Sequence, residues 1–419
     1  MRNKTKTTKK DSWRNKQVLI TGIGGFVGPY LAEYLIGQGA NIFGFDLRRA
    51  DGTKPKNLTD KKLDTIVQLV EGDLVDISSI ASAIDIAKPD VIFHLAGQSY
   101  VKRSFEGPIE TIQANVLGTA NLLEAVRMKE LDPIIVFAGS SEEHGLIFYS
   151  EKQYQNAIKK YKTIFPLPEK FPEIPTKETD PLRPMSPYAV TKVACDYLMR
   201  NYFHSFGLKT IVSRAFNHEG ASRGLMFVTS VITNQVMKLK YGEIDKIFIG
   251  DVGAFRDWSH VKDIVRGYAL LAEKGRFGDV YIQGSMRTNS VLSYILLGLE
   301  NAGWQIKEIK TLNKRIRISR PTEKDNSEKF GIKFLKTKVD KMMLEDKLIF
   351  DIKDKGITVI TDKGEIPMVF DATRFRPAEV PILLCDNTKI KKLGFKVTYS
   401  LKDIIKDQLN YYLKKENRK

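Results

Sequence analysis

The sequence predicts an α/β protein in which helices cover both faces of a parallel sheet, with a smaller mixed α/β domain joined to it. Three observations support this fold class. A short apolar stretch runs into a glycine-rich turn and then a helical pattern at residues 16–28, KQVLITGIGGFVG. Apolar stretches alternate with helical patterns as far as residue 215. Beyond Asn217 this alternation is lost, which indicates a second unit of different architecture.

The first expected strand, Gln17–Thr21, leads into three glycines and a helix that begins near Pro29. Gly22 allows a sharp reversal of the chain, Gly25 leaves the backbone amides open to a phosphate, and Gly28 lets the helix pack closely on the strand. The positive end of the helix then faces the phosphates. This order of strand, glycines and helix predicts a Rossmann-type sheet that binds a dinucleotide.

A carboxylate follows the second expected strand, Asn41–Phe45. Asp46 at this place would accept both ribose hydroxyls of the adenosine half and repel a 2′-phosphate, which modestly favours NAD over NADP. Arg48 and Arg49 stand just beyond it and could instead pair with such a phosphate. The alternative reading of Asp46 is a surface turn residue.

The third and fourth expected strands lie in VQLVEGDLVD and VIFHLAGQS, with an amphipathic helix between them that Ser78 would cap. Asp73 could hold the adenine amine, and Ala96 would let the cofactor lie close. In the next expected helix, Asn115 either bridges to the active-site strand or is exposed. The predicted cofactor-binding residues are Gly22, Gly25, Phe26, Val27, Gly28, Asp46, Arg48, Asp73, Leu74, Ala96, Tyr188 and Lys192.

The remaining elements divide the chain further. A Lys- and Pro-rich excursion at 148–180, with a short helix at Gln153–Tyr161, is expected to run over the site. A second excursion at about 305–371 contains a hairpin turned by Asp362-Lys363-Gly364. Further helices are expected at 227–241, 261–273 and 291–302, and strands at 246–249 and 279–283. We expect a flexible basic tail at 1–15, a dinucleotide-binding domain at 16–215, a mainly substrate-binding domain at 216–412 from which part of the chain returns to the larger domain, and a tail at 413–419.

Composition limits the classes of protein. No apolar run approaches the roughly 18 residues that span a bilayer, so we expect a cytoplasmic protein without a membrane partner. The net charge of +17 is spread along the chain, which favours a solvated basic surface over nucleic-acid binding. Cys195 and Cys385 are expected as free thiols, with one disulfide as the alternative, and the absence of a His/Cys cluster predicts no metal.

Four side-chain types point to chemistry. Tyr188 and Lys192 are four residues apart in a helical pattern and so share one face of a helix, where the ammonium is expected to lower the pKa of the phenol. Ser140 and Ser141 end the fifth expected strand, where a hydroxyl can share a proton with the tyrosine. Together these groups predict a hydride-transfer site. Glu142 could then remove the proton beside a newly formed ketone and help to expel water, or it is a solvated charge at a strand end.

Nine motifs occur in order over nearly all of residues 16–412: GxxGFVG, GDLVDISSI, HLAGQSYV, NVLGTANLLEA, GSSEEHG, SPYAVTK, RAFNHEGASRGLMFVT, FRDWSHVKD and FRPAEVPILLCDNTKIKKLGF. This succession resembles the GDP-mannose 4,6-dehydratase group of the extended short-chain dehydrogenases/reductases, the NAD-dependent epimerase/dehydratase superfamily. The resemblance implies a nucleotide-sugar 4,6-dehydratase that acts on GDP-mannose, recycles a tightly bound NAD(P) and forms a homodimer or homotetramer.

The resemblance also implies residue roles. Ser140, Glu142, Tyr188 and Lys192 match the catalytic hydroxyl, base, tyrosine and lysine. Arginine suits a diphosphate, and Glu379 would accept the donors of guanine. The implied substrate-binding residues are Ser99, Asn217, Arg223, Val228, Arg256, Arg376 and Glu379.

Two related activities stay open, because GSSEEHG, LRPMSPY and RPAEVP also resemble GDP-4-keto-6-deoxy-sugar reductases, and 4-epimerases share the superfamily. The sequence departs from the group's usual pattern at His144, where a tyrosine is expected, and at Asp46, where a basic NADP-selecting loop is expected. A catalytically silent nucleotide sensor is disfavoured because Tyr188 and Lys192 are both present.

Overall fold

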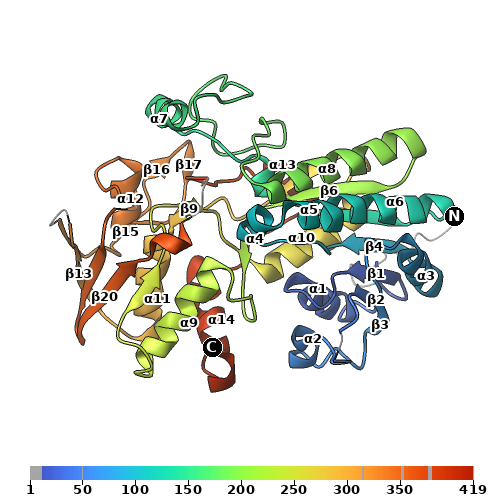
Figure 1. Ribbon diagram of the computed structural model, residues 1–419, viewed down its shortest axis with the longest axis horizontal. Coiled ribbons are helices and arrows are strands. Elements are labelled where there is room, and N and C mark those ends of the chain that lie inside the picture. The colour runs from blue at the N-terminus through green and yellow to red at the C-terminus, as the bar shows by residue number, and fades with distance from the viewer. Residues whose placement is uncertain (1–11, 50, 314–315, 351–352, 376–379, 419) are drawn as a thin grey trace, which may run out of the picture.

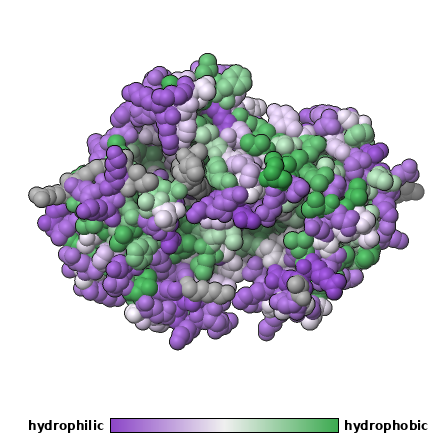
Figure 2. Space-filling model, in the orientation of Figure 1, coloured by the Kyte–Doolittle hydropathy of each residue, from purple (hydrophilic) through white to green (hydrophobic). Residues whose placement is uncertain are grey.

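The structure, a computed structural model, describes residues 12–49, 51–313, 316–350, 353–375 and 380–418. Two units lie side by side, one around a large sheet and the other around a smaller sheet (Figure 1). Hydrophilic side chains dominate the rims of this face, and hydrophobic ones gather toward its middle (Figure 2).

Seven strands form the large sheet in the order β11-β6-β5-β4-β1-β2-β3, and every neighbouring pair is parallel. The chain builds outward from β1 to β3 and then crosses back to β4, so a crevice opens at the carboxyl ends of β1 and β4. The predicted doubly wound α/β class is confirmed. The strands are β1 Gln17–Thr21, β2 Asn41–Asp46, β3 Gln68–Glu71, β4 Val91–His94, β5 Ile134–Ser140, β6 Thr210–Ala215 and β11 Val280–Gln283.

Alternating side chains bury both faces of this sheet. Val18 and Ile20 of β1 belong to one apolar cluster, and Leu19 belongs to the cluster on the opposite face. The first cluster is covered by α1 Val27–Ile36, α2 Lys56–Asp60, α10 Val261–Lys274 and α13 Thr388–Leu393. The second is covered by α3 Ile77–Ala87, α6 Gly118–Met128 and α8 Pro187–Phe206. The helices α4 Val101–Glu106 and α5 Pro108–Ile112 and the π-helix Gln113–Leu117 lead into α6.

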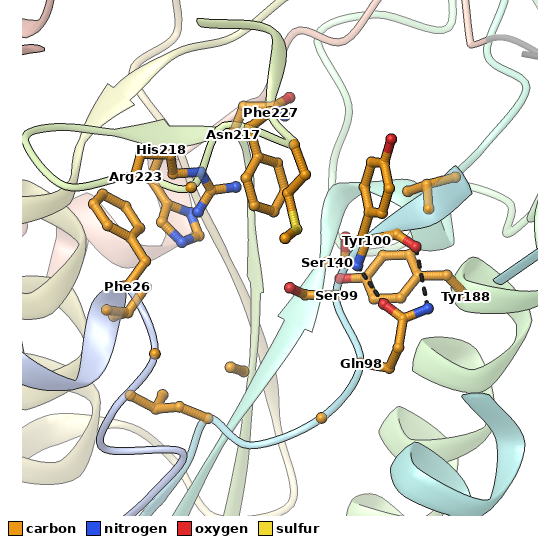
Figure 3. Close-up of a pocket in the computed structure, with 18 of the residues that line it drawn as sticks. Phe26, Gln98, Ser99, Tyr100, Ser140, Tyr188, Asn217, His218, Arg223 and Phe227 are labelled. Carbon is orange, nitrogen blue, oxygen red and sulfur yellow. Dashed lines mark hydrogen bonds between the residues drawn. The ribbon is translucent and has the colours of Figure 1, made fainter. Parts of the chain in front are cut away.

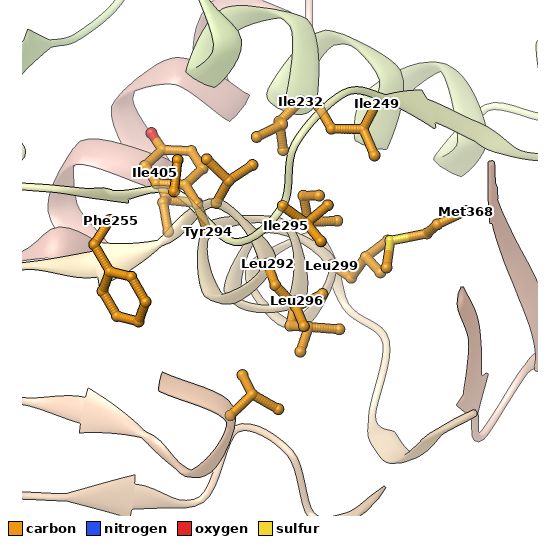
Figure 4. Packing of buried hydrophobic residues seen from close by; sticks show 14 of the residues in the cluster. Ile232, Ile249, Phe255, Leu292, Tyr294, Ile295, Leu296, Leu299, Met368 and Ile405 are labelled. Carbon is orange, nitrogen blue, oxygen red and sulfur yellow. The ribbon is translucent and has the colours of Figure 1, made fainter. Parts of the chain in front are cut away.

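The second unit packs three helices against a five-stranded sheet of order β14-β13-β19-β20-β8. Leu292, Ile295 and Leu299 of α11 lie at the centre of its core (Figure 4). The predicted hairpin is present as β19 and β20, and β20 pairs in parallel with β8. The elements are α9 Val228–Lys240, α11 Val291–Ala302, α14 Leu401–Tyr411, β8 Ile247–Ile249, β13 Ile306–Thr311, β14 Arg317–Ser319, β19 Gly356–Thr361 and β20 Gly364–Phe370.

Short elements complete the described chain. They are β7 His218–Glu219 with β10 Ser259–His260, β9 Phe255–Arg256 with β12 Asn289–Ser290, β15 Lys324–Asp325 with β18 Lys336–Thr337, β16 Glu328–Lys329 with β17 Ile332–Lys333, helices α7 Glu151–Tyr161 and α12 Lys338–Leu344, and 3-10 turns at Ser141–Glu143, Ala372–Arg374 and Lys415–Asn417. In the part of the chain that the structure describes, no helix is both long and apolar enough to cross a membrane, and no cluster of potential metal ligands occurs. Cys195 and Cys385 are both buried and free, as expected.

The described parts of the two expected tails are packed rather than loose. Trp13 is 3% exposed because it packs in the core below β1, where its ring lies 6.0 Å from that of Phe93. Arg418 stacks 4.1 Å from the ring centroid of Tyr241 and pairs with Glu243 at 3.0 Å. The Trp13 indole and the Arg418 guanidinium thus hold these two segments against the rest of the protein. The polar, basic composition of the segments had instead predicted flexible tails.

The cap predicted for α3 is also wrong. Asp76, not Ser78, is the N-cap, and its carboxylate accepts both the amide and the hydroxyl hydrogen of Ser78 at 2.9 and 2.7 Å. Aspartate caps as well as serine does, so the two candidates could not be separated by residue type.

Candidate active site

A cavity of about 1090 Å³ lies at the carboxyl ends of β1, β4 and β5, between the two units. Its walls come from the glycine turn, the strand ends of the large sheet, and the loops of the second unit. The predicted site residues that line it are Gly22, Gly25, Phe26, Val27, Gly28, Asp46, Asp73, Leu74, Ala96, Ser99, Ser140, Glu142, Tyr188, Lys192, Asn217, Arg223, Val228 and Arg256.

Among the predicted site residues that the structure describes, Arg48 does not line the cavity. The Arg48 side chain is 84% exposed and points to Glu71, with its Nε 3.7 Å from the carboxylate. Arg376 and Glu379 lie outside the described residues. The 148–180 excursion does not contribute to the lining, contrary to expectation. The apolar residues of this excursion pack into a separate small core. Its helix α7 also contacts the second unit, where Lys152 pairs with Asp346 at 2.9 Å.

The glycine turn has the close approaches that its sequence predicts. Gly22 has a φ of +71°, and a Cβ there would stand 2.8 Å from the Cα of Ala96. A Cβ on Gly28 would stand 2.5 Å from the carbonyl oxygen of Ile23, so this glycine makes room for the turn itself. The turn therefore leaves a concave surface of backbone beside the start of α1, and that shape fits a dinucleotide pyrophosphate.

Asp46 ends β2 at the edge of this surface. Its Oδ1 accepts the amide hydrogen of Leu47 at 3.1 Å, and burial raises the pKa of its carboxyl group. Any side chain at Gly24 would collide with this carboxylate. Asp46 is thus fixed against the glycine turn, within reach of a ribose bound there.

The acid/base residues sit at the start of α8. Ser186 caps this helix by accepting the Ala189 amide hydrogen at 3.1 Å, and Pro187 occupies its first turn. Tyr188 therefore faces the cavity from the first turn and Lys192 from the next. Ser140 lies beside Tyr188 at the end of β5 (Figure 3). A hydrogen bond from Ser140 to the Tyr188 side chain opposes the rise in the pKa of the tyrosine.

The expected lowering of the Tyr188 pKa is wrong for the protein alone. Burial, opposed by the hydrogen bond from Ser140 and assisted by the nearby carboxylates, raises the pKa of Tyr188 to about 12. The Lys192 ammonium donates to the carbonyl oxygen of Ala138 at 2.8 Å, and burial lowers its pKa. The ammonium is thus engaged by backbone rather than by the phenol.

Asn115 is buried and forms a bridge, but to other partners than expected. Its side chain accepts the Gln98 amide hydrogen at 2.7 Å and donates to the Thr191 hydroxyl at 2.9 Å. It therefore joins the loop after β4 to α8 rather than reaching β5. The π-helix at Gln113–Leu117 gives Asn115 this position.

Buried polar groups line the opposite wall. The Arg223 guanidinium lies between the rings of Phe227 and Phe26, 3.7 and 4.8 Å from their centroids, and burial lowers its pKa. Its Nε makes no hydrogen bond but lies 3.5 Å from Oε2 of Glu219, and Oδ1 of Asn217 has no hydrogen-bond partner. In Figure 3 these groups face Ser99, Ser140 and Tyr188 across the cavity. Because buried polar atoms normally have partners, this wall fits a polar ligand.

The Arg223 loop is held from two sides. The amide of Ala221 donates to Oδ2 of Asp407 on α14 at 2.7 Å, and the Tyr30 hydroxyl donates to the Ala221 carbonyl at 3.0 Å. Arg256 has part of its donor capacity occupied, since its Nη1 donates to the carbonyls of Phe255 and Val380 at 2.8 and 2.7 Å.

Some lining residues were not predicted. Gln98 and Tyr100 flank Ser99 and hydrogen-bond to each other (Figure 3). Their position directly after β4, beside a predicted site residue, could have indicated that they line the cavity. His218 stacks on Phe26 with ring centroids 6.4 Å apart. Arg374 enters from the second unit after a long insertion, and no local pattern pointed to it.

Comparison with known proteins places the chain. A family model described as the NAD dependent epimerase/dehydratase family matches residues 18–283. The chain belongs to this family. Among its relatives, the GDP-mannose 4,6-dehydratase of Yersinia enterocolitica is 30% identical over 393 residues, which cover 91% of this chain and 89% of the relative. The GDP-mannose 4,6 dehydratase 1 of Arabidopsis thaliana is 32% identical over 317 residues, which cover 74% and 81%.

Solved structures of other family enzymes share the fold. A dTDP-glucose 4,6-dehydratase double mutant from Streptomyces venezuelae with NAD bound has a TM-score of 0.65 at 21% identity, covering 94% of this chain and 96% of that one. The RMD structure from Pseudomonas aeruginosa complexed with NADPH has a TM-score of 0.63 at 21% identity, covering 94% and 98%. At this identity the likeness concerns the fold alone.

Proposed function

We propose that this family member is a nucleotide-sugar 4,6-dehydratase that converts GDP-mannose to its 4-keto-6-deoxy product. The observation that carries the proposal is the meeting of Ser140, Glu142, Tyr188 and Lys192 in one cavity with the glycine turn. The dehydratase relatives that match most of the chain support the same reaction and the same substrate.

The division of labour follows the two units. Residues 16–215, completed by β11, α10 and α13, hold a nicotinamide dinucleotide, and most of 216–412 holds the sugar nucleotide. A bound nicotinamide would supply the capacity to take up a hydride and return it. The Tyr188 phenolate, which the hydrogen bond from Ser140 and the Lys192 charge stabilise, takes the proton of the sugar 4-hydroxyl and becomes the neutral phenol.

Water loss is assigned to Glu142. Once C4 is a ketone, the C5 proton is acidic, and the Glu142 carboxylate removes it. The same carboxyl group then protonates the departing 6-hydroxyl, which leaves as water. Reduction of C6 and protonation of C5 complete the product, so that no cofactor is consumed. The Arg223 guanidinium, which lines the cavity, binds the diphosphate through its forked donors.

Mass spectrometry tests this function directly. Purified protein mixed with GDP-mannose and no added dinucleotide should give a product lighter by one water. An unchanged sugar nucleotide would contradict the proposal, and consumption of added NADH or NADPH with a 4-keto sugar would then indicate a reductase. Glu142→Gln should stop water loss while reduction by borohydride still detects some 4-ketone.

The proposal includes NAD as the preferred cofactor. Asp46 stands where a ribose hydroxyl binds, and the Arg48 side chain is directed to Glu71. Calorimetry should give tighter binding of NAD than of NADP, and Asp46→Ala should narrow the difference. Equal affinities in the natural protein would contradict this assignment.

The proposal also includes a cytoplasmic homodimer or homotetramer, for which light scattering measures the mass.

A further inference from the structure

A buried charged cluster lies directly behind the turn that carries Ser140 and Glu142. Oε1 of Glu143 accepts the amide hydrogen of Ser140 at 2.7 Å, and its Oε2 lies 3.1 Å from Nε of Arg214. The same Nε lies 2.9 Å from Oδ2 of Asp196, and the two carboxyl groups hydrogen-bond to each other. The side chains of Glu143 and Asp196 are fully buried.

Two guanidinium groups face the two carboxyl groups of this cluster. Besides Arg214, Arg200 donates from its Nε to Oδ1 of Asp196 at 2.6 Å. Burial, and then the Asp196 charge, raise the pKa of Glu143 well above its usual value. His144 adds no charge, because burial lowers its pKa to about 3, and its Nε2 lies 3.4 Å from Nη1 of Arg214. The carboxyl group of Glu143 is therefore held between the Ser140 amide, Arg214 and Asp196.

The cluster joins the elements on which the reaction depends. Glu143 holds the backbone at the end of β5 through the Ser140 amide. Asp196 belongs to α8, one turn beyond Lys192 and two turns beyond Tyr188. Arg214 belongs to β6, where it pairs with Gly139 of β5. The distance from the Ser140–Glu142 turn to the acid/base helix is thus set by one group of side chains.

We propose that Glu143 is a positioning residue for the dehydration reaction, and this inference rests on the proposed function. Glu143 does not line the cavity; it fixes the backbone from which Ser140 and Glu142 reach the sugar. Its effect on rate follows because a displacement of about 1 Å in a catalytic group can lower a rate about 100-fold. The alternative is a buried ion pair that only stabilises the fold.

Two substitutions at this position separate the alternatives. Glu143→Gln keeps the contacts with Ser140 and Asp196, since its amide oxygen can accept the Ser140 amide hydrogen and its NH₂ group can donate to Asp196. It should keep kcat within about threefold of the natural protein. Glu143→Ala removes both contacts and should lower kcat by about 30-fold or more, with KM for GDP-mannose changed less than about threefold.

A second buried carboxylate supplies the control. Glu173 pairs with Arg183 through two contacts of 2.8 and 2.9 Å, and its side chain is 8% exposed, but neither residue lines the cavity. Glu173→Ala should lower the melting temperature as Glu143→Ala does and leave kcat unchanged. If Glu143→Ala fails to fold, Glu143→Asp replaces it, because the shorter chain keeps the acid and cannot reach the Ser140 amide.

Hydrogen exchange tests the positioning independently of substrate. In the protein without nucleotide sugar, the Ser140 amide should exchange faster in Glu143→Ala than in the natural protein or in Glu143→Gln. Unchanged exchange or unchanged kcat in Glu143→Ala would overturn the inference, as would a Glu143→Gln protein as slow as Glu143→Ala. If the natural protein did not dehydrate GDP-mannose, the proposed function would fail on its own, and the exchange rates would still report whether Glu143 holds the turn.

Discussion

The two ends of the cavity are built from different parts of the protein. The cofactor end is shaped by backbone, with Gly22 and Gly28 letting chain segments approach to distances that a Cβ would block. The sugar end is lined by side chains from separate loops, and Nε of Arg223 and Oδ1 of Asn217 have no hydrogen-bond partner there. The first end should therefore respond to added volume, and the second to altered donors.

The largest effect is expected where the two ends meet. Tyr188→Phe removes the hydroxyl that exchanges the sugar proton while it keeps the ring, so kcat should fall by about 1000-fold or more with dinucleotide binding retained. Tyr197 lies on the same helix and is 56% exposed, so Tyr197→Phe is the matched control. Near-normal turnover in Tyr188→Phe would show that the Tyr188 hydroxyl is not the acid/base group of the reaction.

The cofactor end is tested by one methyl group. Gly22→Ala adds a Cβ against Ala96 at a φ of +71°, and strain of about 1 to 3 kcal/mol should weaken NAD binding about 10- to 100-fold in calorimetry. Gly207→Ala is the control. Gly207 has a φ of +75°, and no atom lies within 4 Å of the position that an added Cβ would take, so this substitution introduces backbone strain without a steric clash. If both variants bound NAD equally well, close approach at Gly22 would not explain the cofactor end.

The sugar end is tested by changing donors at constant charge. Arg223→Lys loses the forked guanidinium that lies between Phe26 and Phe227, so KM for GDP-mannose should rise about 10-fold while NAD affinity stays constant. Arg266 pairs with Asp263 outside the cavity, and Arg266→Lys should leave KM unchanged. A parallel loss of NAD affinity in Arg223→Lys would mean that the two ends are not separable.

The smallest effect concerns stability and pH. Burial, and then the Arg223 charge, lower the pKa of His218 from 6.5 to about 4. Between these values the unfolded chain binds a proton that the folded chain does not, so stability falls as the pH falls through this window. His218→Asn should reduce the slope of the unfolding free energy by about 1.4 kcal/mol per pH unit, measured by denaturant titration at several pH values. His204 is exposed, so His204→Asn is the control and should leave the slope unchanged. An unaltered slope in His218→Asn would contradict the lowered pKa of His218.

The cofactor end could be predicted from sequence because its signals are local. The glycines, the strand Gln17–Thr21 and the carboxylate Asp46 lie within one βαβ unit, and the spacing of Tyr188 and Lys192 on one helix is equally local. Their meeting in one cavity follows from the parallel sheet. The hairpin of β19 and β20 was also visible in the sequence.

Long-range relations could not be predicted in this way. The pairing of β20 with β8 joins residues more than 100 positions apart and leaves no periodic signal. Tyr188 has a raised pKa because it is buried, and the four-residue spacing contains no information on burial. The roles predicted for Arg376 and Glu379 stay predictions.

The anchor of the Arg223 loop has a consequence for the order of assembly. Its hydrogen bond from Ala221 to Asp407 spans 186 residues of sequence. At the usual speed of translation, that interval takes roughly 10 to 40 s. During this time β1 to β6 have already been synthesised, whereas the loop still lacks its partner on α14. On the ribosome, the glycine turn and the strands β1 to β6 therefore emerge well before the sugar end acquires its anchor on α14.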